Sequence, residues 1–386
     1  VLALRRALKE HLPGLAKDLN RINKLLLEKR KACQAEELDA LIEHELPEDL
    51  LKAVWNFIQK AEDWLSLNQP AEFRQELLDF YFACNNYLRT AEYFDTFYVS
   101  YFERRGKSDL RAKLFCLDPA PMLATPLERS QSTIFFSATL LPLDYFKTLL
   151  TGDADHPHHA FRSPFPPQNA RLLIHNRIAT KYKERAHSYL PIASVIETIC
   201  NAQTGNYLVF FPSYAYMDAV LALVKERLPE EQLLIQHRGM TEGERESFLN
   251  QFSTDSSDTL VGFAVMGGIF GEGIDLVGER LIGAIVVGVG LPQMGLERDL
   301  IKAYFQDKTG NGFAYAYQYP GFNRVLQATG RVIRTETDRG IIVLIDERFS
   351  HARYRRLFPP HWEEVQVVQS ESEIKNRLEQ FWPQAL

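Results

Sequence analysis

The stretch Tyr207-Leu208-Val209-Phe210-Phe211-Pro212-Ser213 sets the first expectation for the fold of this chain. Its first five residues are apolar or aromatic without polar alternation, which is typical of a strand that is buried on both faces. A polar serine follows directly. The stretch therefore predicts a buried strand that ends where the chain returns to a polar surface.

Similar strand patterns recur downstream of residue 170 and alternate with helical patterns. The expected strands are Arg171 to His175, Tyr207 to Phe211, Leu233 to His237, Thr259 to Val265, Leu281 to Val289 and Gly340 to Ile345. The expected helices are Ala186 to Ala202, Tyr214 to Arg227, Glu242 to Phe252, Leu296 to Phe305, Phe322 to Ile333, Ser350 to Leu357 and Glu371 to Phe381. Such alternation predicts an α/β fold with a parallel sheet covered by helices on both faces.

The N-terminal part follows a different pattern. From Val1 to about Asn86, apolar residues recur at helical spacing, and Pro47 and Pro70 mark two helix starts. Tyr93 to Phe102 and Leu110 to Leu117 then flank a turn and predict a hairpin, whose aromatic residues we expect to pack in a core. The sequence therefore predicts a helical region that ends in a hairpin.

Bulk composition excludes several classes of protein. No run of 18 or more apolar residues occurs, and the first residues form no signal peptide, so we expect a cytoplasmic protein that does not enter a membrane. The four cysteines form no C-x-x-C pair, which argues against a zinc ribbon or a disulfide framework. The net charge of −6 does not argue against local nucleic-acid contacts, because basic residues still cluster. The clusters are Arg104, Arg105, Lys107, Arg111 and Lys113, and Arg348, Arg353, Arg355 and Arg356.

The segment Gln327-Ala328-Thr329-Gly330-Arg331-Val332-Ile333-Arg334 carries the clearest chemical signal. Two arginines three residues apart on a helix would project from one face. Arginine stays charged at working pH and offers a planar fork of donors, so such a pair suits the charge on a transferring phosphoryl group. We therefore expect Arg331 and Arg334 to face a phosphate.

Two further polar segments follow apolar runs. Ser137-Ala138-Thr139-Leu140 comes after Thr133-Ile134-Phe135-Phe136, and Gly271-Glu272-Gly273-Ile274-Asp275-Leu276 comes after the strand ending at Val265. In open parallel sheets, ligands bind outside the carboxyl ends of the strands. We therefore expect these segments, together with Ser213 and the arginine segment, to meet in one crevice.

The order and content of these segments resemble the C-terminal half of superfamily 2 DNA helicases of the XPD/DinG type. The resemblance runs from about Phe115 to Phe349 and is specific, because Q-x-x-G-R-x-x-R and E-G-I-D-L occur together at the expected separation. The matching segments are motif III (Ser137 to Leu140), motif IV (Phe210 to Tyr214), motif V (Gly271 to Leu276) and motif VI (Gln327 to Arg334).

The resemblance implies three regions. Residues 161–386 would form a RecA-like, P-loop NTPase-type second motor domain, and residues 1–110 an all-helical, arch-like domain that ends in the hairpin. Residues 111–160 would be the tail of a first motor domain, with motif III and a linker. The protein would then be an ATP-dependent DNA helicase that translocates on single-stranded DNA and unwinds duplexes, in repair or replication.

The resemblance also implies roles for single residues. Arg331 and Arg334 would be arginine fingers, Gln327 would orient the nucleotide, and Gly330 would let its helix approach closely. Ser137 and Thr139 would hydrogen-bond between the ATP side and the DNA side, while Glu272, Gly273 and Asp275 would couple the nucleotide state to the grip on DNA. In motif IV, Ser213 and Tyr214 would touch the DNA backbone. The basic cluster around Arg104, Arg105 and Lys107 is either a solvated surface or a set of phosphate contacts along single-stranded DNA.

The residues that hold the nucleotide phosphates are not found in this sequence. Gly106-Lys107-Ser108 imitates the end of a Walker A loop, but Tyr101 stands where its first glycine is required. No D-E-x-H box occurs. We therefore expect ATP and Mg²⁺ to be bound mainly by a missing first motor domain, which the resemblance makes a partner of this chain. An iron–sulfur cluster is possible in that region, and neither a cluster nor another metal site is expected here.

Two other readings remain open at this stage. The chain could be a non-catalytic RecA-like module that binds nucleic acid or a protein partner. It could also be a nucleotide-dependent enzyme on another α/β scaffold, although neither G-x-G-x-x-G nor a nucleophile elbow follows a strand. Under the helicase reading, this chain alone would be inactive.

Overall fold

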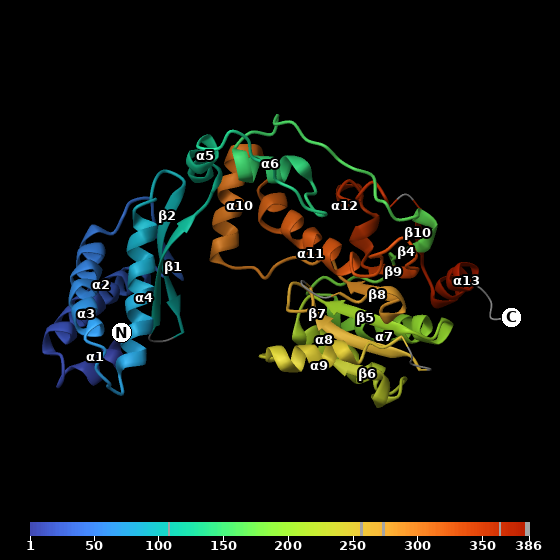
Figure 1. Cartoon of the computed structure of the whole chain (residues 1–386), viewed down its shortest axis with the longest axis horizontal. Helices are drawn as coiled ribbons and strands as arrows, with labels where there is room; N and C mark the ends of the chain where they lie inside the picture. The colour runs from blue at the N-terminus through green and yellow to red at the C-terminus, as the bar shows by residue number, and fades with distance from the viewer. Residues whose placement is uncertain (107–108, 255–257, 272–274, 363, 383–386) are drawn as a thin grey trace. The chain divides into compact units, whose positions relative to one another are not determined.

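The computed structural model describes residues 1–106, 109–254, 258–271, 275–362 and 364–382, and the chain divides into two compact units (Figure 1). Unit 1 comprises Val1–Thr133, Thr148–Asp153 and Asp299–Tyr304. Unit 2 comprises Ile134–Lys147, Ala154–Arg298 and Phe305–Leu386.

Unit 1 combines helices with a small antiparallel sheet in the order β1-β2-β3. Its elements are α1 (Leu2–Leu8), α2 (Pro13–Ala35), β1 (Ala40–Glu43), α3 (Glu48–Ser66), α4 (Arg74–Ala91), β2 (Tyr98–Arg105), β3 (Asp109–Cys116) and α5 (Ala120–Glu128). Strands β2 and β3 confirm the predicted hairpin. Pro47 precedes α3 as expected, whereas α4 begins four residues after Pro70.

Strand β1 corrects the expectation that this part is all helical. Ala40 pairs with Glu103 and Glu43 with Ser100, so β1 lies along the free side of β2. A strand of four residues carries too little pattern to be recognised, because its stability comes from the ladder it forms with a partner distant in the sequence. Phe102 of β2 is fully buried against the helices, together with Leu19 and Phe57. The sheet therefore closes one side of the helical core.

Unit 2 contains a seven-stranded sheet with the order β10-β4-β9-β8-β5-β7-β6. All of its neighbouring strands run parallel, which confirms the predicted sheet. The strands are β4 (Ala170–His175), β5 (Asn206–Phe211), β6 (Leu233–Ile235), β7 (Leu260–Val265), β8 (Gly283–Val287), β9 (Gly340–Ile345) and β10 (Val365–Val368).

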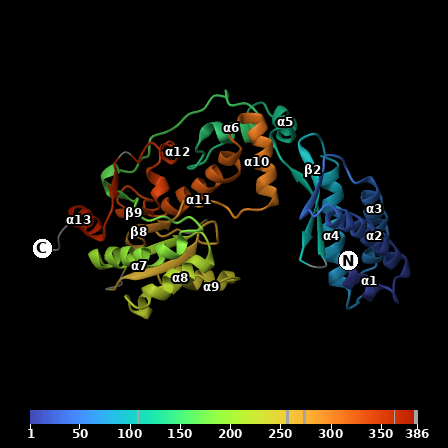
Figure 2. The ribbon, with the colours of Figure 1, turned by 180° about the vertical axis from the view of Figure 1, so that it is seen from behind.

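Helices connect these strands. They are α6 (Leu143–Thr151), α7 (Arg185–Ala202), α8 (Tyr214–Val224), α9 (Glu242–Asn250), α10 (Leu296–Thr309), α11 (Tyr319–Thr329), α12 (Ala352–Arg355) and α13 (Glu371–Phe381). Helices α6 and α10 each include residues of both units. The described residues also include the short helical segments η1 (Pro167–Asn169), η2 (Glu230–Gln232), η3 (Gly278–Arg280), η4 (Ala314–Gln318) and η5 (Glu347–Ser350). Helices α7 and α8 lie side by side when seen from either direction (Figures 1 and 2).

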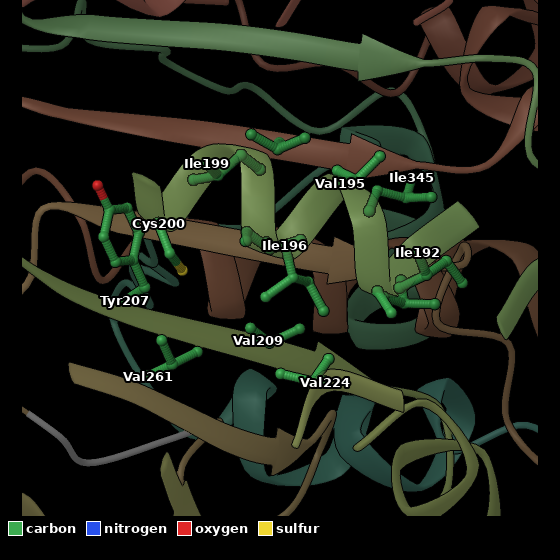
Figure 3. Close-up of a cluster of buried hydrophobic side chains, with 14 of the residues drawn as sticks. Ile192, Val195, Ile196, Ile199, Cys200, Tyr207, Val209, Val224, Val261 and Ile345 are labelled. Atoms are coloured by element: carbon green, nitrogen blue, oxygen red, sulfur yellow. The ribbon is translucent and has the colours of Figure 1, made fainter. Parts of the chain in front are cut away.

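The sheet of unit 2 is buried on both faces because successive side chains of a strand point to opposite sides. Val209 of β5 packs in a cluster with Ile196 of α7, as Figure 3 shows, whereas the next residue, Phe210, packs in a second cluster with Val325 of α11. This arrangement explains why β5 has no polar alternation and confirms the prediction from the first quoted stretch.

The run Thr133-Ile134-Phe135-Phe136 is not the buried strand that the sequence predicts. It has no regular structure, and the side chains of Ile134 and Phe136 are 82% and 90% exposed. The reason is physical: a strand needs a neighbouring strand for its backbone hydrogen bonds, and none of the described strands pairs with this run.

The cysteines are free thiols, of which Cys33, Cys84 and Cys200 are buried while Cys116 is half-buried. Burial raises the pKa of Cys84 and of Cys200 to about 12, so both thiols stay protonated near neutral pH. Over the described residues, no helix combines the length and the apolar character that a membrane crossing requires.

Candidate functional site

The arginine segment lies beyond helix α11 and not on it. The helix ends at Thr329, Gly330 is its C-cap, and the chain continues as a loop through Arg331 and Arg334. Beyond this cap, the backbone N–H groups of Arg334 and Thr335 donate to the Asp338 carboxylate and not to carbonyls of a further helical turn. Val332 still packs in the core of unit 2, where it is 1% exposed. The prediction of two arginines on one helical face is therefore wrong, although Gln327 does lie in the last turn of α11.

Asp338 fixes the shape of this loop. Its Oδ2 accepts backbone N–H bonds from Arg334 at 2.7 Å and from Thr335 at 2.8 Å, and its Oδ1 accepts one from Gly278 at 3.2 Å. Asp338 is 3% exposed, so these bonds form where water competes little. The carboxylate thus joins the arginine loop to the segment that follows motif V.

Two contacts bring motif V and motif VI together. The Arg334 guanidinium donates from Nε at 3.2 Å to Asp275 Oδ1 and lies 3.1 Å from it through Nη2. Arg331 Nη2 donates to the carbonyl oxygen of Gly271 at 3.0 Å. These partners are about sixty residues apart in the sequence. Glu272 and Gly273 lie outside the described residues.

The two arginine contacts lie at different places along the segment that follows β7. Arg331 meets Gly271, which packs against Gly267 and Gly268 at the carboxyl end of β7, whereas Arg334 meets Asp275 farther along the segment. Arg331 and Arg334 precede β9, and Asp275 precedes β8. The Arg280 guanidinium donates to the carbonyl oxygen of Asp275 at 3.4 Å. It also donates to the carbonyl oxygen of Phe252, a residue that precedes β7. Because β7 and β8 run parallel, the chain between them must return to the amino edge of the sheet, and it carries Asp275 there. The expected single crevice is matched in part: the contact of Arg331 with Gly271 stays by the carboxyl end of β7, and that of Arg334 with Asp275 does not.

Gly267 and Arg324 form a close contact that the sequence did not reveal. Gly267 has φ +69°, and a Cβ there would lie 2.9 Å from the Nε atom of Arg324. Burial lowers the pKa of Arg324, and the positive charge of Arg298 lowers it further. Arg324 lies one turn before Gln327 on α11, and this spacing is the one sequence signal that could have indicated Arg324 as a site residue. The glycine loop after β7 is thus packed against the Arg324 side chain of α11.

Motif IV lies at the carboxyl edge of the sheet. The Ser213 hydroxyl caps α8 by accepting the Tyr216 N–H at 3.4 Å. The Tyr214 hydroxyl accepts from Gln236 Nε2 at 3.0 Å, and the Arg238 guanidinium lies 5.1 Å from the Tyr214 ring centroid. Gln236, which no sequence motif reveals, is 3% exposed and also accepts the Val265 N–H at 2.8 Å. Ser213 and Tyr214 therefore have structural partners at the edge where DNA contacts were predicted.

The motif III hydroxyls and Gly330 are exposed to solvent. The Ser137 and Thr139 hydroxyls are exposed and lie 3.3 Å apart, and the Thr139 N–H donates to Ser137 Oγ at 3.2 Å. Gly330 is also exposed, and a Cβ there would meet only the carbonyl oxygens of Leu326 and Gln327 in its own helix. Close approach to another element is therefore not the reason for this glycine.

In unit 1, the predicted DNA-binding arginines lie on β2. Arg105 pairs with Glu103 at 2.8 Å, and Arg111 of β3 lies 3.9 Å from the same carboxylate. Arg104 Nη1 is 3.5 Å from the carbonyl oxygen of Leu38. Lys107 lies outside the described residues. Glu103 thus offsets part of the positive charge of this sheet. Among the residues with described positions, no group of three or more His, Cys, Asp or Glu could hold a metal ion.

Comparison with known families identifies a Helicase C-terminal domain over residues 196–365. Among curated proteins, the XPD helicase subunit of general transcription and DNA repair factor IIH from Arabidopsis thaliana is 24% identical over 343 residues, covering 80% of this chain and 43% of that protein. The ATP-dependent helicase DinG of Mycobacterium tuberculosis is 24% identical over 274 residues, covering 67% and 39%. The ATP-dependent DNA helicase chl1 of Aspergillus fumigatus is 23% identical over 300 residues, covering 67% and 38%.

The chain spans about two fifths of the length of these relatives, by shares of 43%, 39% and 38%. Two solved structures share its fold. A structure of apo XPD matches 84% of this chain and 63% of its own with a TM-score of 0.56 and 17% identity. The structure of S. tokodaii Xpd4 matches 95% and 70% with a TM-score of 0.56 and 14% identity. The fold is therefore that of an RecA-like helicase domain with its attached N-terminal region.

Proposed function

This chain belongs with the XPD/DinG-type superfamily 2 DNA helicases, and we propose that it supplies the arginine-bearing half of an ATP-dependent motor on single-stranded DNA. The observation that carries the proposal is the contact of Arg334 with Asp275 and of Arg331 with Gly271. It unites the arginine loop with the segment that leads back to the carboxyl edge of the sheet. Most of the groups that bind ATP and Mg²⁺ would lie on the other motor domain.

Arg331 and Arg334 would provide positive charge to the γ-phosphate when the two motor domains close. The Arg334 side chain is 37% exposed and its partner Asp275 is 68% exposed, so a competing phosphate oxygen can reach this guanidinium. Preorganised arginines of this kind stabilise charge that develops during phosphoryl transfer. Gln327, half-buried in the last turn of α11, would help to orient the nucleotide.

The segment from Gly267 to Asp275 would couple the two edges of the sheet. It begins at the carboxyl end of β7, where Gly267 meets Arg324, and reaches Asp275 at the amino edge. When Arg334 leaves Asp275 for a phosphate, the segment loses one of its anchors. Glu272 and Gly273 belong to the same segment in sequence. Ser213, Tyr214, Arg104 and Arg105, with Lys107 and the motif III hydroxyls of Ser137 and Thr139, would complete the path to DNA.

The test of this proposal is ATP hydrolysis by the longest reading frame that contains this chain, with and without single-stranded DNA. We expect turnover that DNA stimulates, as well as unwinding of a duplex with a single-stranded tail. If that protein binds DNA but turns over no ATP, the non-catalytic RecA-like module becomes the better description. Under the proposal, residues 1–386 alone hydrolyse no ATP.

Binding of single-stranded DNA to this chain should be weak and should fall steeply with salt. For a protein that contacts about three phosphates of a single strand, the logarithm of the binding constant falls with the logarithm of the salt concentration with a slope of about −2. Fluorescence anisotropy with a labelled oligonucleotide across a salt series would measure the slope. A salt-independent affinity would contradict phosphate contacts by the basic residues.

Replacing Asp275 by asparagine should change coupling more than stability. An exposed ion pair contributes less than about 1 kcal/mol, so the free energy of unfolding should change by no more than that. The ratio of ATP turnover with DNA to turnover without DNA should fall in the longer protein, because the motif V segment loses its charged anchor. Asp307→Asn, at an exposed carboxylate on α10, is the matched control. Equal ratios in both variants would contradict the coupling role.

A further inference from the structure

The loop that follows β4 presents an aromatic ring to solvent. Tyr182 is 86% exposed, which is unusual for a tyrosine in a well-packed unit. The loop begins at the carboxyl end of β4 and leads into α7 at Arg185. Nothing in motifs III to VI includes this residue, and its exposure calls for an explanation in terms of a ligand or partner.

The ring is held in place from one side. The guanidinium carbon of Arg185 lies 5.5 Å from the centroid of the Tyr182 ring and 4.4 Å from that of Tyr216. Tyr216 is 1% exposed, so Arg185 rests on a ring that is fixed in the core. The three side chains form a stack of ring, guanidinium and ring. Since Tyr182 ends the stack and is largely exposed, one face of its ring is available to a planar ligand.

The backbone of the loop is anchored to the neighbouring strand end. The Thr180 hydroxyl donates to the buried carboxylate of Asp346, directly after β9. Lys181 pairs with Glu347 at 2.5 Å, and the Glu347 N–H donates to the carbonyl oxygen of Ile178 at 3.1 Å. These contacts reduce the entropy that ordering the loop around a ligand would cost. The ring is therefore preorganised at the carboxyl edge of the sheet.

The platform adjoins motif IV. Tyr216, the base of the stack, donates its backbone N–H to the capping hydroxyl of Ser213. An exposed cation, Lys183, lies next to Tyr182 on the same loop. Lys181, on its other side, is paired with Glu347. Two carboxylates accompany them, of which Glu347 is paired with Lys181 and Glu184 is exposed.

We propose that Tyr182, stacked on Arg185, is a platform on which a base of single-stranded nucleic acid stacks, with Lys183 near its phosphates. An aromatic face accepts any base, which suits a motor that must not depend on sequence. The cation under the ring supports such a stack by its own attraction to π-systems. The inference rests on the proposed function and adds to it a base contact at the carboxyl edge of the sheet.

The test compares binding of this chain to a thymidine oligonucleotide and to an abasic oligonucleotide of the same length. Tyr182→Ala should weaken binding to the thymidine strand by about 5- to 150-fold, which corresponds to the stacking of one base. Tyr182→Phe should retain the affinity, because it retains the ring. On the abasic strand, the wild type and Tyr182→Ala should bind equally. Phe161→Ala is the matched control, because Phe161 is 87% exposed in the same unit.

The other outcomes overturn the platform. Wild-type affinity for the thymidine strand in Tyr182→Ala would favour a protein-docking role for this ring. Equal losses on thymidine and abasic strands would show a structural role. An equal loss in Phe161→Ala would show that any exposed ring contributes. If the wild-type chain binds neither strand, the DNA-binding part of the proposed function fails first. If the wild type binds DNA but Tyr182→Ala does not weaken binding to the thymidine strand, the platform alone fails.

Discussion

Arg334→Ala should reduce DNA-stimulated ATP turnover of the longest reading frame containing this chain by about 10³-fold or more, since an arginine finger contributes about 10³–10⁵ in rate in related phosphoryl-transfer systems. The Arg334 side chain is 37% exposed and paired with a largely exposed carboxylate, so its removal should leave folding nearly unchanged. A steady-state ATPase assay at saturating ATP, with thermal unfolding measured in parallel, separates the two effects.

Arg377→Ala is the matched control for this experiment, because Arg377 is an exposed arginine on α13 of the same unit. It should leave turnover unchanged. Arg334→Lys keeps the charge but not the planar fork of donors and should recover only part of the rate. Turnover within a few-fold of the wild type in Arg334→Ala would remove this residue from the catalytic role, while Arg331 could be tested in the same way.

Arg348→Ala should lower the free energy of unfolding of unit 2 by about 3–5 kcal/mol, because it leaves a buried carboxylate without its counter-charge. Asp346 is fully buried, and Arg348 binds it through Nε and Nη2, each at 2.8 Å, while the Arg348 backbone N–H adds a third bond at 2.8 Å. The Thr180 hydroxyl also donates to this carboxylate. Urea unfolding, with the midpoint and the slope both reported, measures the loss.

A double variant tests whether the loss arises from the uncompensated charge. Asp346→Asn combined with Arg348→Met removes both charges and should cost less than Arg348→Ala alone. The exposed pair of Lys375 and Glu379, 3.9 Å apart, is the control, and Lys375→Ala should cost less than about 1 kcal/mol. If Arg348→Ala costs no more than this control, the buried pair does not hold the ends of β4 and β9 together.

The sequence predicted the parts of the fold that depend on local pattern. The uninterrupted apolar run at Tyr207 to Phe211 could be satisfied only by burial on both faces, and β5 has that burial. Strand β10 escaped prediction because its four residues, of which three are half-buried or exposed, form an edge strand with little apolar signal. The apolar run Ile134 to Phe136 predicted a buried strand that the structure does not contain, because apolar character alone does not supply a pairing partner.

The site was predicted in its residues but not in its geometry. The spacing of Arg331 and Arg334 indicated a helical face, yet the helix ends at Gly330 and the backbone N–H groups of Arg334 and Thr335 bond Asp338 instead of helical carbonyls. Sequence reasoning likewise placed Asp275 after a strand, whereas the return of the chain between parallel strands carries it to the amino edge. Tyr182 had no motif to reveal it, because its significance comes from its exposure and from Arg185 beneath it.

By itself, the sequence determined the α/β class, the hairpin of unit 1 and the identity of the motif residues, because hydrophobic period and residue chemistry are local properties. Only the tertiary structure decided the strand order, the pairing of Arg334 with Asp275 and the contact of Arg331 with Gly271 beside the carboxyl end of β7. These depend on contacts between residues distant in the chain, and their energies come from packing and burial that no local pattern records.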